Sequence, residues 1–407
     1  MATEPATLLK ASLSWAFILL LTALFSTAGT GHALEKIHLV KLDTNCTYYA
    51  TFQSHNQKVL QNSHGMFLTY LVDYEDTPPW PGFWRLLRST DGGATFSVIY
   101  TSPEVGSKAA CIETDEARKH IRTLRRCNRP KQAASDLPLS RRQELHRPRH
   151  LEFQWKQVVE TSGRYAQTQY PHLYVGRDGT LHHAWTTQKL DKYLYWDIHY
   201  ARSPDDGKTW FTANGARLYC PIKPDNSGKS DEIVLPDELE YHTWLSSMVV
   251  KDGKVHFAYM AQTPQPREEY VRLDLVSGEI DIRIQPVWSG DTISILGLDG
   301  FFVTGPGSSP LYFVGRTNYT RIGVIVSYDN GESWHDWAIS DPIPNSIYSI
   351  GGFRTITEDD YIIGSFTSQY GSRGDPYFFK VRVSERGFAF LFLLSGFFVR
   401  RRIWLPR

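Results

Sequence analysis

The chain has 407 residues, of which 41% are hydrophobic, 14% aromatic and 21% charged. This composition can bury a large core, as one big all-β domain or as two smaller domains, and it argues against an intrinsically disordered protein. The formal net charge of +1 hides an asymmetry, because residues 117–150 hold 11 of the 44 Lys and Arg residues but only 2 of the 43 Asp and Glu residues.

Residues 1–33 have the features of a secretory signal peptide. Lys10 precedes an apolar run from Leu13 to Phe25, and small residues follow up to Ala33. The apolar run is shorter than the ~20 residues that a bilayer requires, so a membrane anchor is the less favoured interpretation. We therefore expect cleavage after Ala33, an extracellular or periplasmic location, and no stable membrane span in the mature chain.

Secretion would expose two further sequence features, the N-glycosylation sequons and the cysteines, to chemistry of the secretory route. The sequons at residues 45–47 and 318–320 become candidate acceptors for glycans if the source cell glycosylates its proteins. The four cysteines could form one or two disulfides, and the sequence does not choose among the three pairings. These cysteines are Cys46, Cys111, Cys127 and Cys220.

Three segments share the pattern Ser-x-Asp-x-Gly-x-Thr/Ser-aromatic. They are STDGGATF at 89–96, SPDDGKTW at 203–210 and SYDNGESW at 327–334. The Asp carboxylate can accept N–H groups across a tight turn, the Gly supplies a positive φ, and the aromatic ring can pack beneath the hairpin. We therefore interpret Asp91, Asp205 and Asp329 as structural residues of turns.

The spacing of these turns predicts the architecture. The three copies begin 114 and 124 residues apart, which suits every second unit of about 57 to 62 residues. A glycine turn before a strand is a second repeated feature, and the distances from Gly65 to Ser89 and from Gly179 to Ser203 are both 24 residues. Residues 34–383 could hold six such units, so we predict one all-β domain, a six-bladed β-propeller.

Two segments do not fit this repeat. Residues 117–150 are predicted to be a basic insertion or irregular segment that disrupts the second unit, and residues 384–407 an atypical C-terminal tail. The basic block could attract an anionic glycan or nucleic acid. A solvated loop or a mistranslated piece of gene is the favoured interpretation, so we expect no nucleic-acid partner.

The three Asp-containing turns resemble the Asp boxes, or BNR repeats, of the sialidase superfamily, over most of residues 34–383. In that superfamily the boxes lie on outer hairpins, away from the substrate. The resemblance therefore implies a propeller fold and a carbohydrate partner, which could be acidic. It implies no cofactor, and the His and carboxylate spacings are not those of a metal motif.

The strands before the glycine turns are expected to line a central channel, where the inner strands of a propeller form the binding site. These strands are unusually polar for buried strands. Their polar residues are the predicted site residues Asn56, Gln57, Lys58, Gln169, Tyr170, His172, Tyr241, His242 and Arg354.

A sialidase-like glycoside hydrolase is the first predicted function. The segments RIGVIVSYDNGESW and IYSIGGFRTI resemble the sialidase order of an arginine strand, an Asp box and a Tyr-Ser pair. The resemblance implies that Tyr348 is the nucleophile, that Arg321 or Arg316 binds a carboxylate, and that Asp73 is the acid. A neutral, base-assisted phenol suits this role because it avoids repulsion from the substrate carboxylate.

The sequence departs from the sialidase pattern at three places. NQKV replaces the family's Arg-Ile-Pro on the first inner strand, the glutamate partner of the tyrosine would fall near Trp244, and a second arginine near Tyr259. We count Trp244, Tyr259 and Arg316 with the substrate-binding residues and leave the substrate sugar open.

Two alternatives use residues that are present. A propeller-shaped polysaccharide lyase could use His and Tyr to remove the proton α to a uronate carboxylate. Its candidates are His172, His183, His242, Tyr170, Tyr241 and Tyr259. A non-catalytic glycan-binding propeller could instead stack sugars on Trp80, Trp84, Trp185 or Trp196. In each case we expect a monomer.

Overall fold

The regular structure of the described residues is entirely β. The computed structural model describes residues 34–52, 57–73, 82–103, 109–114, 121–124, 158–160, 165–189, 194–223, 232–235, 243–262, 266–285, 300–305 and 309–383. The chain divides into two compact units, Met1–Leu34 and Glu35–Arg407, and every strand belongs to the second. None of the described segments is a helix that could span a membrane. The predicted signal peptide and C-terminal tail lie outside the described residues.

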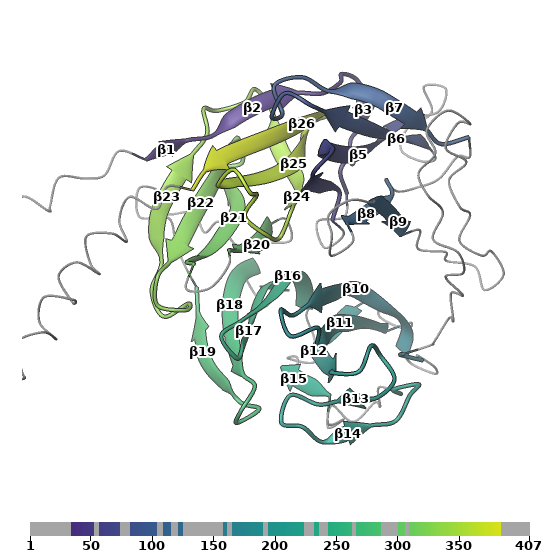
Figure 1. Ribbon diagram of the computed structural model, residues 1–407, viewed down its shortest axis with the longest axis vertical. Coiled ribbons are helices and arrows are strands. Elements are labelled where there is room, and N and C mark those ends of the chain that lie inside the picture. The colour runs from purple at the N-terminus through teal and green to yellow at the C-terminus, as the bar shows by residue number, and fades with distance from the viewer. Residues whose placement is uncertain are drawn as a thin grey trace, which may run out of the picture. The chain divides into compact units, whose positions relative to one another are not determined.

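The first three sheets follow the chain in order (Figure 1). The first sheet consists of β4 (Val59–Asn62), β5 (Gly65–Asp73), β6 (Gly82–Ser89) and β7 (Ser97–Thr101). The second sheet pairs β8 (Cys111–Thr114) with β9 (Ile121–Leu124). The third sheet consists of β10 (Tyr165–Val175), β11 (Leu181–Lys189), β12 (Leu194–Ser203), β13 (Trp210–Phe211) and β14 (Arg217–Leu218), with β15 (Ile233–Leu235) beside β12.

The last three sheets repeat the meander. The fourth consists of β16 (Thr243–Lys251), β17 (Lys254–Gln262), β18 (Pro266–Asp274) and β19 (Ile280–Ile284). The fifth consists of β20 (Gly300–Thr304), β21 (Leu311–Thr317), β22 (Arg321–Ser327) and β23 (His335–Ile339), with β1 (Glu35–Lys36) parallel to β23. The sixth consists of β24 (Ser346–Gly352), β25 (Tyr361–Tyr370) and β26 (Arg373–Arg382), with β2 (His38–Lys41) and β3 (Cys46–Thr47) against β26.

One strand lies inside the segment predicted to be an irregular insertion. Residues 121–124 form β9, which pairs antiparallel with β8 from Cys111↔Leu124 to Thr114↔Ile121. In the sequence Ile-Arg-Thr-Leu, the β-branched residues Ile and Thr alternate with Arg and Leu. Four residues suffice for a short strand. The high local charge obscured this alternation. The rest of residues 117–150 lies outside the described part of the chain.

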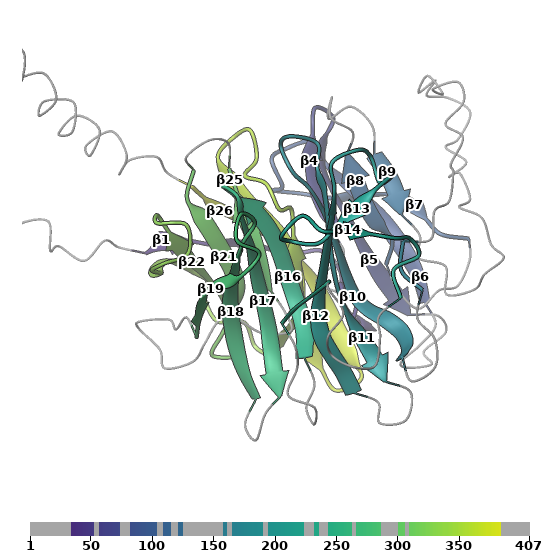
Figure 2. The same ribbon diagram turned by 90° about the horizontal axis from the view of Figure 1, so that it is seen from below.

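The sheets pack on one another in chain order. The first strands of neighbouring sheets are in contact, β10 with β16, β16 with β20, β20 with β24, β24 with β4, and β4 with β8. The N-terminal strand β2 pairs with β26, so the beginning of the domain completes its last sheet (Figure 1). Figure 2 shows the inner strand β16 of the fourth sheet beside β10 of the third. The all-β prediction is confirmed, and closure of the sheets into a six-bladed ring stays a prediction.

The apolar core lies between neighbouring sheets. Phe257 of β17 packs with Tyr200 and Leu235 of the third sheet, whereas the next residue, Ala258, packs with Phe302 and Phe313 of the fifth. Successive residues of a strand point to opposite faces, so both faces of the fourth sheet are covered. This explains the near-continuous apolar runs of strands such as β22, where burying each large side chain contributes about 1.5–3 kcal/mol.

The meander gives each sheet two distinct ends. The turn end carries the turns between the first and second strands and between the third and fourth strands. The start end carries the first residues of the inner strands β4, β10, β16, β20 and β24, together with the loops between second and third strands. The three Asp boxes are third-to-fourth turns, so they lie at the turn end.

The Asp boxes have the turn chemistry that their sequence suggests. Asp91 Oδ1 accepts the backbone N–H groups of Ala94 and Thr95 at 3.0 and 2.9 Å, and Asp91 Oδ2 accepts the Thr95 hydroxyl at 2.5 Å. Asp205 and Asp329 repeat the pattern with Thr209 and Ser333. The bonds from Thr95 and Thr209 hold the pKa of Asp91 and Asp205 below the ordinary range.

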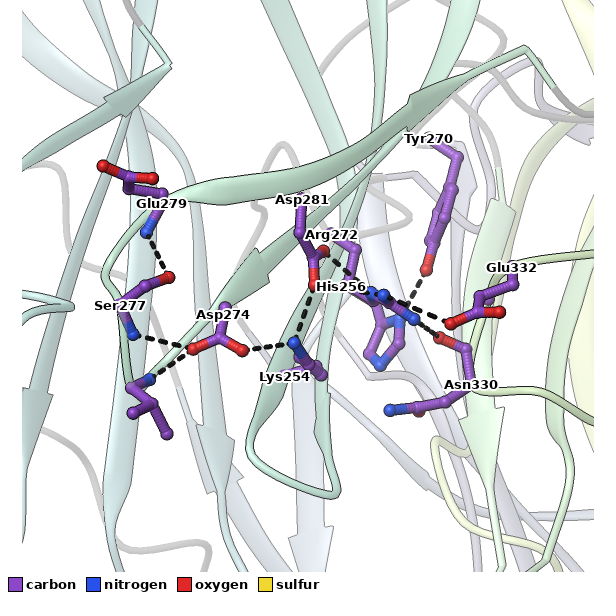
Figure 3. Close-up of polar contacts among 12 residues, drawn as sticks. Lys254, His256, Tyr270, Arg272, Asp274, Ser277, Glu279, Asp281, Asn330 and Glu332 are labelled. Atoms are coloured by element: carbon purple, nitrogen blue, oxygen red, sulfur yellow. Dashed lines mark hydrogen bonds and ion pairs between the residues drawn. The ribbon is translucent and has the colours of Figure 1, made fainter.

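Two Asp boxes are tied to the sheet beside them. Arg272 Nη1 of β18 donates to the Asn330 carbonyl oxygen at 2.9 Å, as Figure 3 shows, and Lys380 Nζ of β26 donates to the Gly92 carbonyl oxygen at 2.7 Å. The Tyr270 hydroxyl accepts or donates a 2.7 Å bond with His256 Nδ1 and lies against Gly331. The boxes therefore join adjoining sheets as well as closing hairpins.

Candidate functional site

Three inner strands are irregular near the start end. The pairing register shifts between Gln169 and His172 in β10, between Leu245 and Ser247 in β16, and between Tyr348 and Gly351 in β24. Tyr170 and Ser349 have left-handed φ angles of 47° and 60°. Bulges and strained residues of this kind redirect side chains and gather at functional sites. We therefore take this level of the inner strands as the candidate site.

Tyr348 lies beneath an arginine. The Arg316 guanidinium carbon is 5.2 Å from the centre of the Tyr348 ring and 4.9 Å from that of Tyr319. Arg316 Nη1 also donates to the Ile347 carbonyl oxygen at 3.0 Å, which fixes the guanidinium beside β24. A guanidinium has further N–H groups that can bind a carboxylate. The Tyr348 hydroxyl and the Arg316 guanidinium can therefore contact the same carboxylate group of a ligand.

The bulge that follows Tyr348 is held by threonine hydroxyls. Thr51 Oγ1 donates to the Ser349 carbonyl oxygen at 3.0 Å and lies 2.8 Å from Thr367 Oγ1. Thr51 is 1% exposed, and Thr367 is fully buried and paired with Tyr348 across the sheet. A rare φ persists only when its surroundings fix it, and these bonds do so. They determine where the Tyr348 side chain leaves β24.

His172 joins two bulges instead of facing a substrate. Its Nδ1 lies 2.9 Å from the Tyr170 carbonyl oxygen and its Nε2 lies 3.0 Å from that of Ser246. The side chain is 1% exposed, and burial, with the nearby Arg354 charge, lowers its pKa to about 3. A neutral imidazole has one N–H and can satisfy one of the two carbonyls. The predicted role of a general base does not fit this position.

Aromatic rings continue the start end across the third and fourth sheets. The Tyr195 ring lies 5.4 Å from that of Tyr170, in an edge arrangement, and 6.1 Å from that of Trp244. Tyr170 and Trp244 are half-buried. Aromatic side chains commonly line ligand sites. Tyr195 was not predicted, because it follows a loop rather than a glycine turn.

Three predicted catalytic residues are engaged elsewhere. The Asp73 carboxylate forms an ion pair with Arg373 and its side chain is 9% exposed. Arg321 Nη1 donates to the Ser340 carbonyl oxygen at 3.1 Å, and Arg354 Nη1 donates to that of Leu173 at 2.5 Å. Arg354 lies beyond the end of β24, roughly 20 Å along the strand direction from Tyr348. Each of the three therefore interacts with a partner other than Tyr348.

Three predicted binding residues are buried. Gln57 Nε2 donates to the Ile112 carbonyl oxygen at 3.2 Å, and the Lys58 side chain is 2% exposed. The Tyr259 hydroxyl donates to Glu269, which pairs with Arg283 at 2.6 Å. This Tyr–Glu pair was not predicted, because the resemblance placed the glutamate near Trp244. The register of the β17–β18 hairpin sets Glu269 opposite Tyr259.

Several other predicted residues fall into two groups. Asn56, Tyr241, His242 and Trp80 lie outside the described residues, as does the side chain of Gln169. Trp185 is fully buried, with its ring stacked 5.1 Å from that of His199, and Trp196 is 7% exposed. Both rings are therefore buried, and they do not form a sugar-binding rim. Among the residues that the structure describes, no His, Cys, Asp and Glu group has metal-site geometry.

Residues 140–274 match the model of a BNR repeat-containing family. The resemblance that the Asp boxes suggested is thereby confirmed for a third of the chain. No curated protein matches the chain significantly.

The chain is similar, at low identity, to solved structures that include two polysaccharide lyases and a sialidase. The polysaccharide lyase Uly1 is 9% identical, with a TM-score of 0.50, over 86% of this chain and 100% of that one. An ulvan lyase is 12% identical, with a TM-score of 0.42, over 79% and 63% of the two chains. The Trypanosoma rangeli sialidase with the inhibitor DANA is 13% identical, with a TM-score of 0.46, over 84% and 59%. At these identities the likeness to Uly1 bears on the fold alone.

Proposed function

We propose that this protein is a secreted, carbohydrate-active six-bladed β-propeller whose site lies at the start end and takes a sugar with a carboxylate. The observation that carries the proposal is the Arg316 guanidinium held over the Tyr348 ring. The BNR repeat match and the pairing of β2 with β26 support the propeller part. The signal-peptide pattern of residues 1–33 supports secretion.

Sialidase-like hydrolysis is the first candidate reaction. The Tyr348 hydroxyl would lose its proton to water as its oxygen attacks the anomeric carbon, and the glycosidic bond would break as the leaving oxygen takes a proton. Water would then cleave the tyrosyl glycoside. Arg316 would pair with the substrate carboxylate and so orient the ring. Asp73 could supply the proton only after its ion pair with Arg373 opens. Substrate binding would have to move Arg373 for this route.

Lyase chemistry is the second candidate, and the same ion pair favours it. Elimination needs a base near the proton α to the uronate carboxylate and a cation that neutralises that carboxylate. The Tyr348 oxygen would take the α proton and pass it to the leaving sugar oxygen as the C–O bond breaks and the double bond forms, while Arg316 would pair with the carboxylate. Asp73 would then stay with Arg373 as a structural pair.

A turnover screen separates the reactions. The secreted protein is given sialosides, neutral aryl glycosides and polyuronates, and products are followed as released aglycone or as ultraviolet absorbance of an unsaturated uronate. We expect turnover of an acidic substrate, lost when its carboxylate is methyl-esterified. Arg316→Gln should weaken binding of the acid and leave that of the ester unchanged. Equal use of acid and ester by the parent protein would contradict the carboxylate assignment.

A further inference from the structure

The turn between β21 and β22 has an unusual combination of exposure and rigidity. Thr317 and Arg321 are the last paired residues, and Asn318 and Tyr319 adopt left-handed φ angles of 49° and 54°. Asparagine tolerates this conformation better than most residues. The Tyr319 and Thr320 carbonyl oxygens accept the N–H groups of Ile347 and Ile343 at 2.7 and 2.9 Å. The backbone is therefore fixed, while the side chains of Asn318 and Tyr319 are exposed.

Asn318 begins the tripeptide Asn-Tyr-Thr, which is an acceptor sequence for N-linked glycans. Asn318 is exposed, Tyr319 is 57% exposed, and Thr320 is half-buried. Within the described part of the chain, the Asn318 side-chain amide makes no hydrogen bond that modification would break. We propose that Asn318 is an N-glycosylation site. The proposal depends on secretion and is independent of the reaction that the protein catalyses.

The chemistry requires a glycosyl donor of one class, an oligosaccharide on a polyprenyl diphosphate. The Asn318 Nδ2 atom bonds to the anomeric carbon of the donor, and the bond from that carbon to the diphosphate oxygen breaks. The amide nitrogen loses one proton and the polyprenyl diphosphate leaves. The secretory route predicted from residues 1–33 would bring the chain to such a donor.

The second acceptor sequence, Asn45-Cys46-Thr47, is a natural comparison within the molecule. Asn45 is exposed and has a left-handed φ of 57°, as Asn318 does. However, Cys46 and Thr47 are 2% and 1% exposed, and β3 pairs them with Gly374 and Arg373. The Thr47 hydroxyl is therefore hidden once β26 forms, whereas the 318–320 turn stays open. Asn318 should be modified more completely than Asn45.

The glycan would stand beside the candidate site. Asn318 is two residues from Arg316, and the guanidinium of Arg316 lies between the Tyr319 and Tyr348 rings. Because the turn backbone is tied to Ile343 and Ile347, a sugar on Asn318 needs no rearrangement of these residues. The glycan would thus border the start end without filling the space over Tyr348.

The test is site-specific mass spectrometry of the full chain secreted by insect or mammalian cells. Enzymatic deglycosylation in heavy-oxygen water labels each formerly glycosylated asparagine. We expect the label on most copies of Asn318 and on a smaller fraction of Asn45. Thr320→Val should abolish the label at Asn318 and leave Asn45 unchanged, while Thr320→Ser, which keeps the hydroxyl, should retain it. Unlabelled Asn318 in the parent protein, whether secreted or retained, would overturn the proposal.

Discussion

The Arg316 guanidinium covers two tyrosine rings, which provides a matched pair of variants at the residue scale. Tyr348→Phe removes one hydroxyl and keeps the ring, so turnover should fall by at least ~100-fold while the melting temperature is almost unchanged. Tyr319→Phe removes the hydroxyl of the other ring under the same cation and should retain activity. Steady-state kinetics on the best substrate of the screen measures both.

The two reaction candidates agree on this prediction, so the two variants test the site rather than the mechanism. If Tyr348→Phe keeps its full rate, Tyr348 is a binding residue and the phenol has no part in the reaction. If both variants lose activity equally, the rings act by orienting Arg316. The product then decides between hydrolysis and elimination, since only elimination yields an unsaturated uronate.

Residue roles could be predicted from the sequence only where the interaction is local. Asp91 bonds to Ala94 and Thr95, within four positions, so the motif itself contains the partners. His172 depends on Ser246, and Asp73 depends on Arg373, 300 positions away. Long-range partners of this kind convert a polar residue from a free functional group into a structural one, and a single sequence does not reveal them.

At the element scale, the packing of Gly331 against Tyr270 predicts a measurable coupling between sheets. A Cβ atom on Gly331 would lie 1.7 Å from the Tyr270 hydroxyl, with φ at 93°. Gly207, at the same place in another Asp box, has φ of 81° and no neighbour closer than 3.7 Å. Gly207→Ala should therefore lower the free energy of unfolding by about 1–3 kcal/mol through backbone strain. Gly331→Ala should have the same strain and lower it by ~1–3 kcal/mol more through the clash with Tyr270.

The coupling is tested by adding Tyr270→Phe, which removes the clashing oxygen. We expect the double variant Gly331→Ala with Tyr270→Phe to be more stable than the sum of the single changes, as measured by urea unfolding. Tyr270→Phe combined with Gly207→Ala should be additive. Additivity in both pairs would mean that Gly331 is required for its φ alone.

The repeated elements were predictable because each is a short hairpin with its own turn signal. Gly179 and Gly253 both have positive φ and lie in the turns before the second strands of their sheets, as the sequence indicated. The bulges were not predictable, because Tyr170 and Ser349 have left-handed φ angles although neither is a residue type that favours this conformation. Tertiary contacts impose these conformations, and they decide which inner-strand side chains reach the site.

At the scale of the whole molecule, the N-terminal strand β2 should stabilise the domain by pairing with β26. Ile37 is 2% exposed in the core, the four residues of β2 pair with β26, and the last of them, Lys41, forms an ion pair with Asp375 at 2.6 Å. A chain that begins at Leu42 should unfold at lower urea concentration and aggregate through the exposed β26 edge. A chain that begins at Ile37 keeps β2 and serves as the control. Equal urea midpoints for the two chains would show that β2 is dispensable.

Acid should destabilise the whole domain over a defined pH range, because several histidines are buried in the neutral form. Burial lowers the pKa of His172 and His256 to about 3 and that of His182 to about 4. Histidines in an unfolded chain titrate near pH 6.5, so between about pH 6.5 and 4 the unfolded state binds more protons than the folded state. The free energy of unfolding should therefore fall as the pH drops through this range.

The variant His182→Gln separates this effect from general acid sensitivity. His182 alone should account for a loss of about 3 kcal/mol between pH 7 and pH 4, at roughly 1.4 kcal/mol per pH unit of pKa difference. Urea midpoints measured from pH 7 to pH 4 should decline less steeply for His182→Gln, which cannot take up that proton. The control His335→Gln changes an exposed histidine and should follow the parent slope. Parallel slopes for all three proteins would show that His182 is protonated as readily in the folded state as in the unfolded chain.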